Sequence, residues 1–133
     1  MADYTVLNLR DDVADSAEGF GLAPDLEAHF ASGNLGLTRS GISFQRLAPG
    51  FRLPFGHRHD QQEELYVVLS GALRAKVEED VVELGRLDAL RVAPEVTRQF
   101  EAGPEGAELL AFGAPHTGPP SEDVEMQPGW WSE

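Results

Sequence analysis

From Gly41 onward, the chain consists of short hydrophobic runs that are separated by turn residues. Several runs alternate apolar with polar side chains, a period of two that is typical of strands with one buried face. Leu73–Val77 and Val81–Leu84 flank a polar turn and predict a hairpin. Many short strands at regular spacing predict an all-β sandwich or barrel. The predicted strands are Ile42–Leu47, Glu64–Ser70, Leu73–Val77, Val81–Leu84, Ala89–Val92, Arg98–Glu101 and Glu108–Phe112.

One short helix is predicted before these strands. Pro24 suits a first helical position, acidic residues follow it in the first turn, and Gly33 suits the end of the helix. Leu26 and Phe30 are four residues apart and would be buried together, whereas His29 is expected at the surface.

The two ends of the chain differ from the middle, which gives three parts: an N-terminal arm with the helix (1–40), a barrel (41–113) and a tail (114–133). The arm includes a short extended stretch, Tyr4–Leu9. The tail holds four prolines, so we expect it to be largely irregular. It also holds Trp130 and Trp131, and at least one of them should dock on the barrel or on a second subunit, because exposed tryptophans are an apolar liability.

Composition excludes several classes of protein. A length of 133 residues fits one domain, and no apolar run is long enough to span a membrane. The net charge of −13 argues against nucleic acid and anionic membranes as partners, because both repel an acidic surface. With no cysteine and no basic, apolar leader at the N-terminus, a cytoplasmic location is the expectation.

The residues most suggestive of chemistry are His57, His59 and Glu64. Side chains at i and i+2 of a strand point the same way, so both imidazoles would face one side. Glu64 opens the next strand and can face the same cavity; a one-residue slip would replace it with Glu63. Two imidazoles and one carboxylate on one face form a triad that binds a divalent metal with coordination positions left open. The alternative is a pair of surface histidines.

The spacing of these residues resembles the first motif of the cupin family, G-x5-H-x-H-x(3,4)-E-x6-G. His57, His59, Glu64 and Gly71 match it, whereas Gly50 lies one residue too far upstream. The stretch from Gly85 to Phe100 resembles the second motif, G-x5-P-x-G-x2-H-x3-N, in a degenerate form. Its Pro94 matches, Glu95 replaces a glycine, and Arg98 stands where the family has its fourth metal ligand, a histidine.

The resemblance covers about residues 41–113 and implies a cupin jelly-roll barrel that forms a homodimer. Carried over by position, His57, His59 and Glu64 would hold the metal, which could be Zn, Ni or Fe. Arg98 cannot ligate a metal. It could pair with Glu64 and fill the place of the metal, leaving the site metal-free, or it could turn to the cavity mouth and anchor an anionic substrate.

Other cavity residues have more than one interpretation. Tyr66 shares the face of Glu64 and could fill the core or contact substrate, and Val68, Phe44, Phe51, Phe55 and Phe100 are expected in the core. If Arg98 leaves the metal site, His116 or Gln62 could add a ligand.

Two classes of function remain open at this stage, because this fold hosts many activities. The chain could bind a small polar or anionic metabolite in the barrel, with Arg98 and Tyr66 contacting it. The alternative is a metal-dependent enzyme, a dioxygenase or isomerase of a small metabolite.

Overall fold

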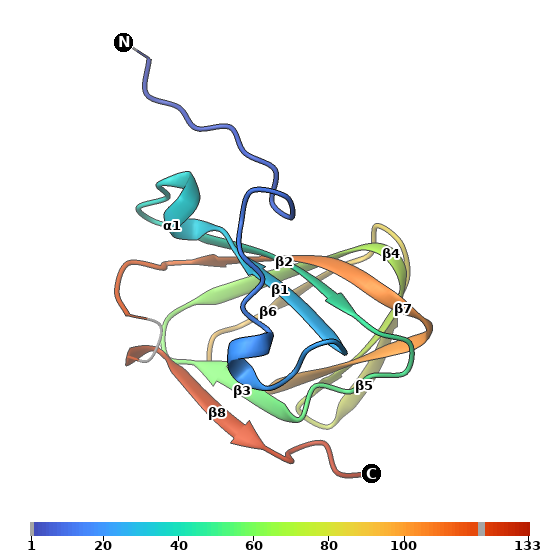
Figure 1. Ribbon diagram of the computed structural model, residues 1–133. Helices are drawn as coiled ribbons and strands as arrows, with labels where there is room; N and C mark the ends of the chain where they lie inside the picture. Colours follow the sequence, from blue (N-terminus) through green and yellow to red (C-terminus); the bar gives the residue numbers. More distant parts are fainter. Residues whose placement is uncertain (1, 120–121) are drawn as a thin grey trace.

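The strands form one curled antiparallel sheet in the computed structural model, which describes residues 2–119 and 122–133 (Figure 1). This confirms the predicted all-β barrel architecture. The elements are η1 (Glu18–Phe20), β1 (Leu26–Phe30), α1 (Ser32–Leu35), β2 (Gly41–Leu47), β3 (Phe55–His59), β4 (Glu63–Val77), β5 (Asp80–Leu84), β6 (Ala89–Val92), β7 (Arg98–Ala114) and β8 (Val124–Pro128). Among the described residues, no helix has the length and apolar character needed to cross a membrane.

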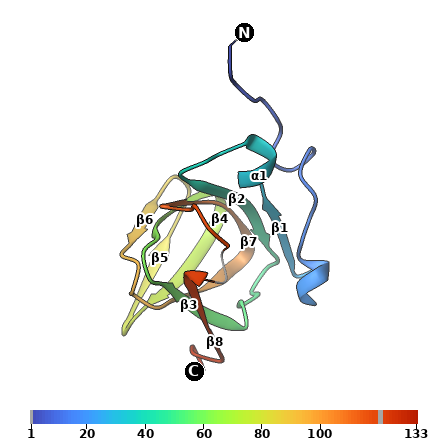
Figure 2. The ribbon, with the colours of Figure 1, turned by 90° about the vertical axis from the view of Figure 1, so that its left-hand side faces the viewer.

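The two longest strands, β4 and β7, organise the sheet. They pair with each other along most of their length, and β7 also pairs with β2 at one end and β3 at the other. Strand β4 also pairs with β5 and β6. Strand β1 pairs with β2, and β8 pairs with β3. The sheet therefore wraps around an interior, as the turned view shows (Figure 2).

Both long strands continue through turn residues that were expected to separate shorter strands. The predicted strands at residues 64–70 and 73–77 are joined in β4, and those at 98–101 and 108–112 are joined in β7. Gly71 has φ 71° and sits between two register shifts of the β4–β7 pair. A Cβ at Gly71 would lie 2.0 Å from the carbonyl oxygen of Gly106, so only glycine allows this close approach. The pair bulges and bends here instead of ending.

The helix predicted over residues 24–33 is wrong in position. Leu26–Phe30 forms β1 and pairs with β2 along its whole length, and the short helix α1 follows it at Ser32–Leu35. Leu26 and Ala28 are buried, whereas Phe30 is half exposed, so Leu26 and Phe30 are not buried together. Cross-strand pairing and core burial outweigh the helix-start signals, because local propensity is a weak prior. The stretch Tyr4–Leu9 forms no strand.

The expectation that His29 lies at the surface is also wrong. Its side chain is buried, its Nδ1 donates to the carbonyl of Val13 at 2.6 Å, and its Nε2 lies 2.7 Å from Glu27 Oε2. Both partners are acceptors, so the protonated imidazole satisfies both bonds. His29 thus joins Val13, in the segment that precedes η1, to β1.

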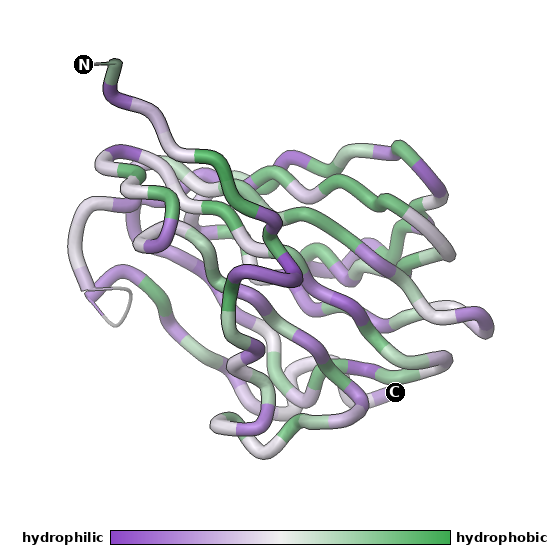
Figure 3. Tube along the Cα trace, turned by 45° about the horizontal axis from the view of Figure 1, so that its top comes forward, coloured by the Kyte–Doolittle hydropathy of each residue, from purple (hydrophilic) through white to green (hydrophobic). Residues whose placement is uncertain are grey.

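The core lies inside the curl of the sheet. Hydrophobic (green) and hydrophilic (purple) residues alternate along parts of the strands, as expected when one face of a strand is buried (Figure 3). Val68, Leu73, Leu47 and Leu109 are fully buried. Of the aromatic residues predicted for the core, Phe44, Tyr66 and Phe100 are buried, and Phe51 packs against the core while partly exposed.

The described part of the tail includes the strand β8, which pairs with β3. Beyond it, Trp131 is 3% exposed, its backbone N–H donates to Gln99 Oε1, and the guanidinium of Arg52 stacks 4.0 Å from its ring. Positions 120 and 121 of the tail lie outside the described residues.

Candidate metal and ligand site

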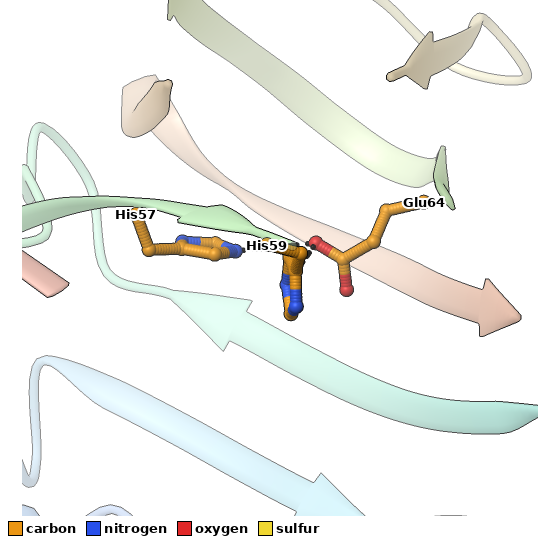
Figure 4. A group of neighbouring side chains, drawn as sticks. All are labelled: His57, His59 and Glu64. Carbon is orange, nitrogen blue, oxygen red and sulfur yellow. Dashed lines mark hydrogen bonds and ion pairs between the residues drawn. The ribbon is translucent and has the colours of Figure 1, made fainter. Parts of the chain in front are cut away.

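Two adjacent strands bring His57, His59 and Glu64 together. His57 and His59 alternate with Arg58 on β3, so their side chains share one face, and Glu64 follows the turn on β4. His57 Nε2 lies 3.1 Å and His59 Nε2 3.2 Å from Glu64 Oε1. Figure 4 shows the two rings and the carboxylate converging. The prediction that these side chains share one face is confirmed.

The spacing of these three groups fits a metal ion. One ligand atom from each residue lies within 4.8 Å of the others. Two ligands about 2.1 Å from one ion and at right angles to each other are about 3 Å apart, which matches both measured N–O distances. Within the described residues these three form the group that could hold a metal. Imidazole and carboxylate accept several divalent metals, so the donor set does not identify the ion.

A second carboxylate orients His59. Asp123 Oδ2 accepts a hydrogen bond from His59 Nδ1 at 2.8 Å, and Asp123 Oδ1 accepts the backbone N–H of Gln61. This bond directs Nε2 of His59 toward Glu64, as in metal sites where an outer carboxylate fixes the ligating ring. Sequence reasoning missed Asp123 because it lies in the tail, far along the chain from β3, and no local pattern marks it.

Arg98 lies behind Glu64 and away from the cavity. The side chain is 0% exposed, and its Nη2 lies 2.7 Å from Glu64 Oε1. Nη1 donates to the carbonyls of Pro94 and Val96, which fixes the guanidinium from the opposite side. Of the two orientations expected for Arg98, the structure shows the pair with Glu64. Arg98 is not among the residues that line the cavity.

Tyr66 completes the support of the carboxylate. Its hydroxyl donates to Glu64 Oε1 and accepts a hydrogen bond from Arg98 Nε at 3.2 Å. The ring packs on Phe100 with 4.6 Å between centroids, and the residue lines the cavity. Tyr66 is therefore both a core residue and part of the cavity wall.

Gln62 and His116, considered as additional ligands, form a hydrogen-bonded chain to Glu64. Gln62 Nε2 donates to Glu64 Oε2 at 2.9 Å, and His116 Nδ1 donates to Gln62 Oε1 at 2.9 Å. Two glycines that oppose each other in the β2–β7 pair make room for them. A Cβ at Gly113 would lie 2.2 Å from Gln62 Nε2, and one at Gly41 would lie 3.0 Å from the His116 ring.

The buried charges shift the ionisation of the three candidate ligands. Burial raises the pKa of Glu64, but hydrogen bonds from His57, His59 and Tyr66 outweigh it, so the net pKa is far below its usual range. Burial lowers the pKa of His57, so this ring is neutral and able to ligate. Burial also lowers the pKa of His59, but Glu64 and Asp123 outweigh it and raise the net pKa. A metal would therefore have to displace a proton from His59.

The site opens into a cavity of about 860 Å³, a volume typical of small-molecule sites. Apolar side chains from β1, β2 and β7 form much of its wall, and the carboxylates of Glu64, Glu122 and Asp123 also face it. Among the described residues that line it there is no lysine or arginine. Any positive charge offered to a ligand must therefore come from a histidine or a bound metal.

Comparison with known proteins places the chain in a family. A model of the cupin domain matches residues 43–113. A cupin protein from Bacteroides fragilis is 27% identical, with 86% of each chain covered and a TM-score of 0.70. Two further structures share the fold. KdgF from a Halomonas species is 14% identical, with 83% of this chain and 93% of that chain covered and a TM-score of 0.66. A sugar phosphate isomerase of the cupin superfamily from Silicibacter pomeroyi is 22% identical, with 84% of this chain and 68% of that chain covered and a TM-score of 0.61. No curated protein sequence matches this chain. The chain therefore belongs to the cupin family, through a domain that covers more than half of its length.

Proposed function

We propose that this protein binds a divalent transition metal through His57, His59 and Glu64 and uses it to hold a small metabolite in the cavity. The observation that carries the proposal is the pair of N–O distances, 3.1 and 3.2 Å, between the imidazoles and one oxygen of Glu64. The three side chains lie in the wall of a cavity that is large enough for a metabolite. When bound, the metal supplies a Lewis acid and a positive charge in a cavity whose described lining residues include no lysine or arginine.

The chain supplies the geometry of this site. Asp123 orients His59, and Tyr66 and Arg98 hold Oε1 of Glu64 from behind. The positive charge of Arg98 also opposes metal binding, so the metal site is weaker than one without this charge. Arg98 would act on a ligand through Glu64, whereas Tyr66 reaches the cavity wall itself. The metabolite carries a polar or anionic group at the end that meets the metal, because no lysine or arginine is found among the described residues that line the cavity.

A metal-dependent enzyme is the second candidate. His57, His59 and Glu64 would supply three protein ligands and so leave coordination positions free for a substrate, which favours a dioxygenase or an isomerase over a closed structural site. Metal content separates the candidates: a redox-active metal at one equivalent per chain supports the dioxygenase, and zinc supports the binder or an isomerase.

The test is metal binding by protein purified without chelators or a histidine tag. Elemental analysis and calorimetry with Zn²⁺ and Ni²⁺ should give one site per chain in the wild type. His57→Ala and His59→Ala should each lose it, because two ligands bind a divalent ion poorly. His29→Gln is the matched control, since this imidazole lies outside the three-residue group and does not line the cavity, and it should keep the site. Retention of the site in His57→Ala would contradict the proposal.

We also propose that the protein is a cytoplasmic homodimer. The first described residues, 2–9, extend away from the barrel (Figure 1), and among them Tyr4 and Val6 are 78% and 84% exposed. Such apolar exposure favours contact with a second copy. Light scattering should give about twice the chain mass of 14.5 kDa, and Tyr4→Ser with Val6→Ser should lower it. A monomer with or without the substitutions would overturn this proposal.

A further inference from the structure

We infer that the ligand of this cavity has an extended apolar body and a single polar end that meets the metal. The inference rests on the proposed metal-dependent binding and adds the chemical class of the ligand. It follows from how polar and apolar side chains are distributed along the cavity wall.

The register of β4 against β7 produces a gradient of polarity. Glu64 pairs with Gly113 at one end, where the hydrogen-bonded chain of Gln62 and His116 also lies. Two residues along, Tyr66 pairs with Ala111, and the Tyr66 hydroxyl is already bonded to Glu64. Polar groups of the wall are thus gathered at the Glu64 end.

The wall beyond Tyr66 is largely apolar. Leu109 follows Ala111 on the same face of β7, and Leu26, Ala28 and Leu47 line the cavity from β1 and β2. Two polar residues on β2 also line this part, and Gln45 Nε2 donates to Ser43 Oγ at 3.1 Å. That bond occupies part of their hydrogen-bonding capacity. A ligand rich in hydroxyl groups would leave most of them unpaired here, at a free-energy cost for each.

The cavity also has an exposed apolar rim, formed by Phe20, Phe30 and Met126. All three line the cavity, and they are 60%, 48% and 47% exposed. The rings of Phe20 and Phe30 meet edge to face with 6.2 Å between centroids. Large apolar side chains gathered at a cavity mouth are typical of sites that receive apolar ligands.

The charge of the wall restricts the polar end to one anionic or chelating group. Carboxylates of Glu64, Glu122 and Asp123 face the cavity, and no lysine or arginine among the described residues lines it. A ligand with several anionic groups could place one on the metal, and the others would meet negative potential.

A series of monocarboxylates tests this inference on protein loaded with Zn²⁺. Butanoate, hexanoate and octanoate should bind with increasing affinity by calorimetry, up to about fourfold for each added methylene. 6-Hydroxyhexanoate has the same six-carbon chain and carboxylate as hexanoate but ends in a hydroxyl too far from the carboxylate to chelate with it, and it should bind at least about tenfold more weakly. 6-Hydroxyhexanoate binding as tightly as hexanoate, or affinity that does not change with chain length, would overturn the inference. Because Zn²⁺ binding is measured first, that result would leave the proposed metal site intact.

Substitution at the rim locates the binding. Phe20→Ser removes an exposed ring, so the fold should persist; it should weaken octanoate by about threefold or more and leave Zn²⁺ affinity unchanged. Val81→Ser is the control, because Val81 is also an exposed apolar residue (39%) but does not line the cavity; it should leave octanoate binding unchanged. Equal octanoate affinity in Phe20→Ser and wild type would overturn the inference. A second result would also overturn it: Phe20→Ser could lower the molecular mass of the assembly in solution without weakening octanoate binding. The rim would then be an interface between copies of the chain.

Discussion

Replacement of Arg98 by histidine tests how this chain departs from the family pattern. An ion about 2.1 Å from Glu64 Oε1 would lie within about 5 Å of Arg98 Nη2, because Nη2 is 2.7 Å from the same oxygen. At an effective dielectric near 20, repulsion between a single and a double charge at that distance is about 7 kcal/mol. A repulsion only one fifth as large would still lower the affinity for the metal about tenfold. Arg98→His removes the repulsion and adds an imidazole, so metal affinity should rise at least about tenfold.

The same substitution should destabilise the metal-free protein. Arg98 is fully buried, and it donates to Glu64, Tyr66, Pro94 and Val96. Removal of one member of a buried ion pair typically costs about 3–5 kcal/mol. Added Zn²⁺ or Ni²⁺ should recover about 2.7 kcal/mol of this at a concentration of one hundred times Kd.

The assay is calorimetry with Zn²⁺ and Ni²⁺ at about pH 7.5, where ordinary histidines are mostly neutral. Circular dichroism first establishes that each variant is folded. Arg98→Leu removes the charge without adding a ligand, so it should show the part of the gain that comes from lost repulsion. His59→Ala in the Arg98→His background should abolish the gain. Equal affinities of wild type, Arg98→His and Arg98→Leu would refute the reasoning, because the guanidinium would then exert no effect on the metal.

Three further predictions concern residues that support the site and the fold. Asp123→Asn should lower metal affinity by about 10- to 100-fold by calorimetry, because it weakens the hydrogen bond that orients His59; an unchanged affinity would contradict this role. Burial lowers the pKa of His29, but its bonds to Glu27 and to a backbone carbonyl raise the net pKa above its usual 6.5. The protonated ring then stabilises the fold fully below about pH 6.5 and loses this effect as the pH rises through the folded pKa. Urea unfolding should therefore show a larger loss of stability in His29→Gln at pH 6 than at pH 9, and an equal loss would refute it. Trp131→Ala should lower the free energy of unfolding by about 3–5 kcal/mol, and Trp131→Phe by much less, because the buried Nε1 of Trp131 has no hydrogen-bond partner among the described residues. Equal melting temperatures of the two variants would contradict this.

Sequence reasoning predicted the parts of the molecule that depend on local geometry. Alternation along β2, β5 and β6 predicted these strands, because side chains of a strand alternate between its two faces. The same rule placed His57 and His59 on one side and brought Glu64 near them. The family motif depends on this spacing, so both could be recognised without tertiary contacts.

Tertiary structure decided the elements where distant pairing competes with local preference. The stretch from Leu26 to Phe30 carries helix-start signals, yet pairing with β2 makes it a strand. Glycine is a residue type that often ends a strand, so Gly71 was a plausible strand end. Its close approach to Gly106 instead makes it part of a bulge within a longer strand. In each case, burial and hydrogen bonding with a segment far along the chain outweighed the local signal.

The partners of the site were also decided by tertiary structure. The sequence left two orientations for Arg98, and only the position of Glu64 relative to β7 distinguishes them. Asp123 reaches His59 because β8 pairs with β3, and Phe20 meets Phe30 because η1 packs near the end of β1. Side-chain alternation follows from the backbone of one strand, so the sequence alone determined which residues share a face. Contacts between residues distant in the chain depend on how the whole sheet curls, so only the tertiary structure decided the charge at the site and the apolar rim of its cavity.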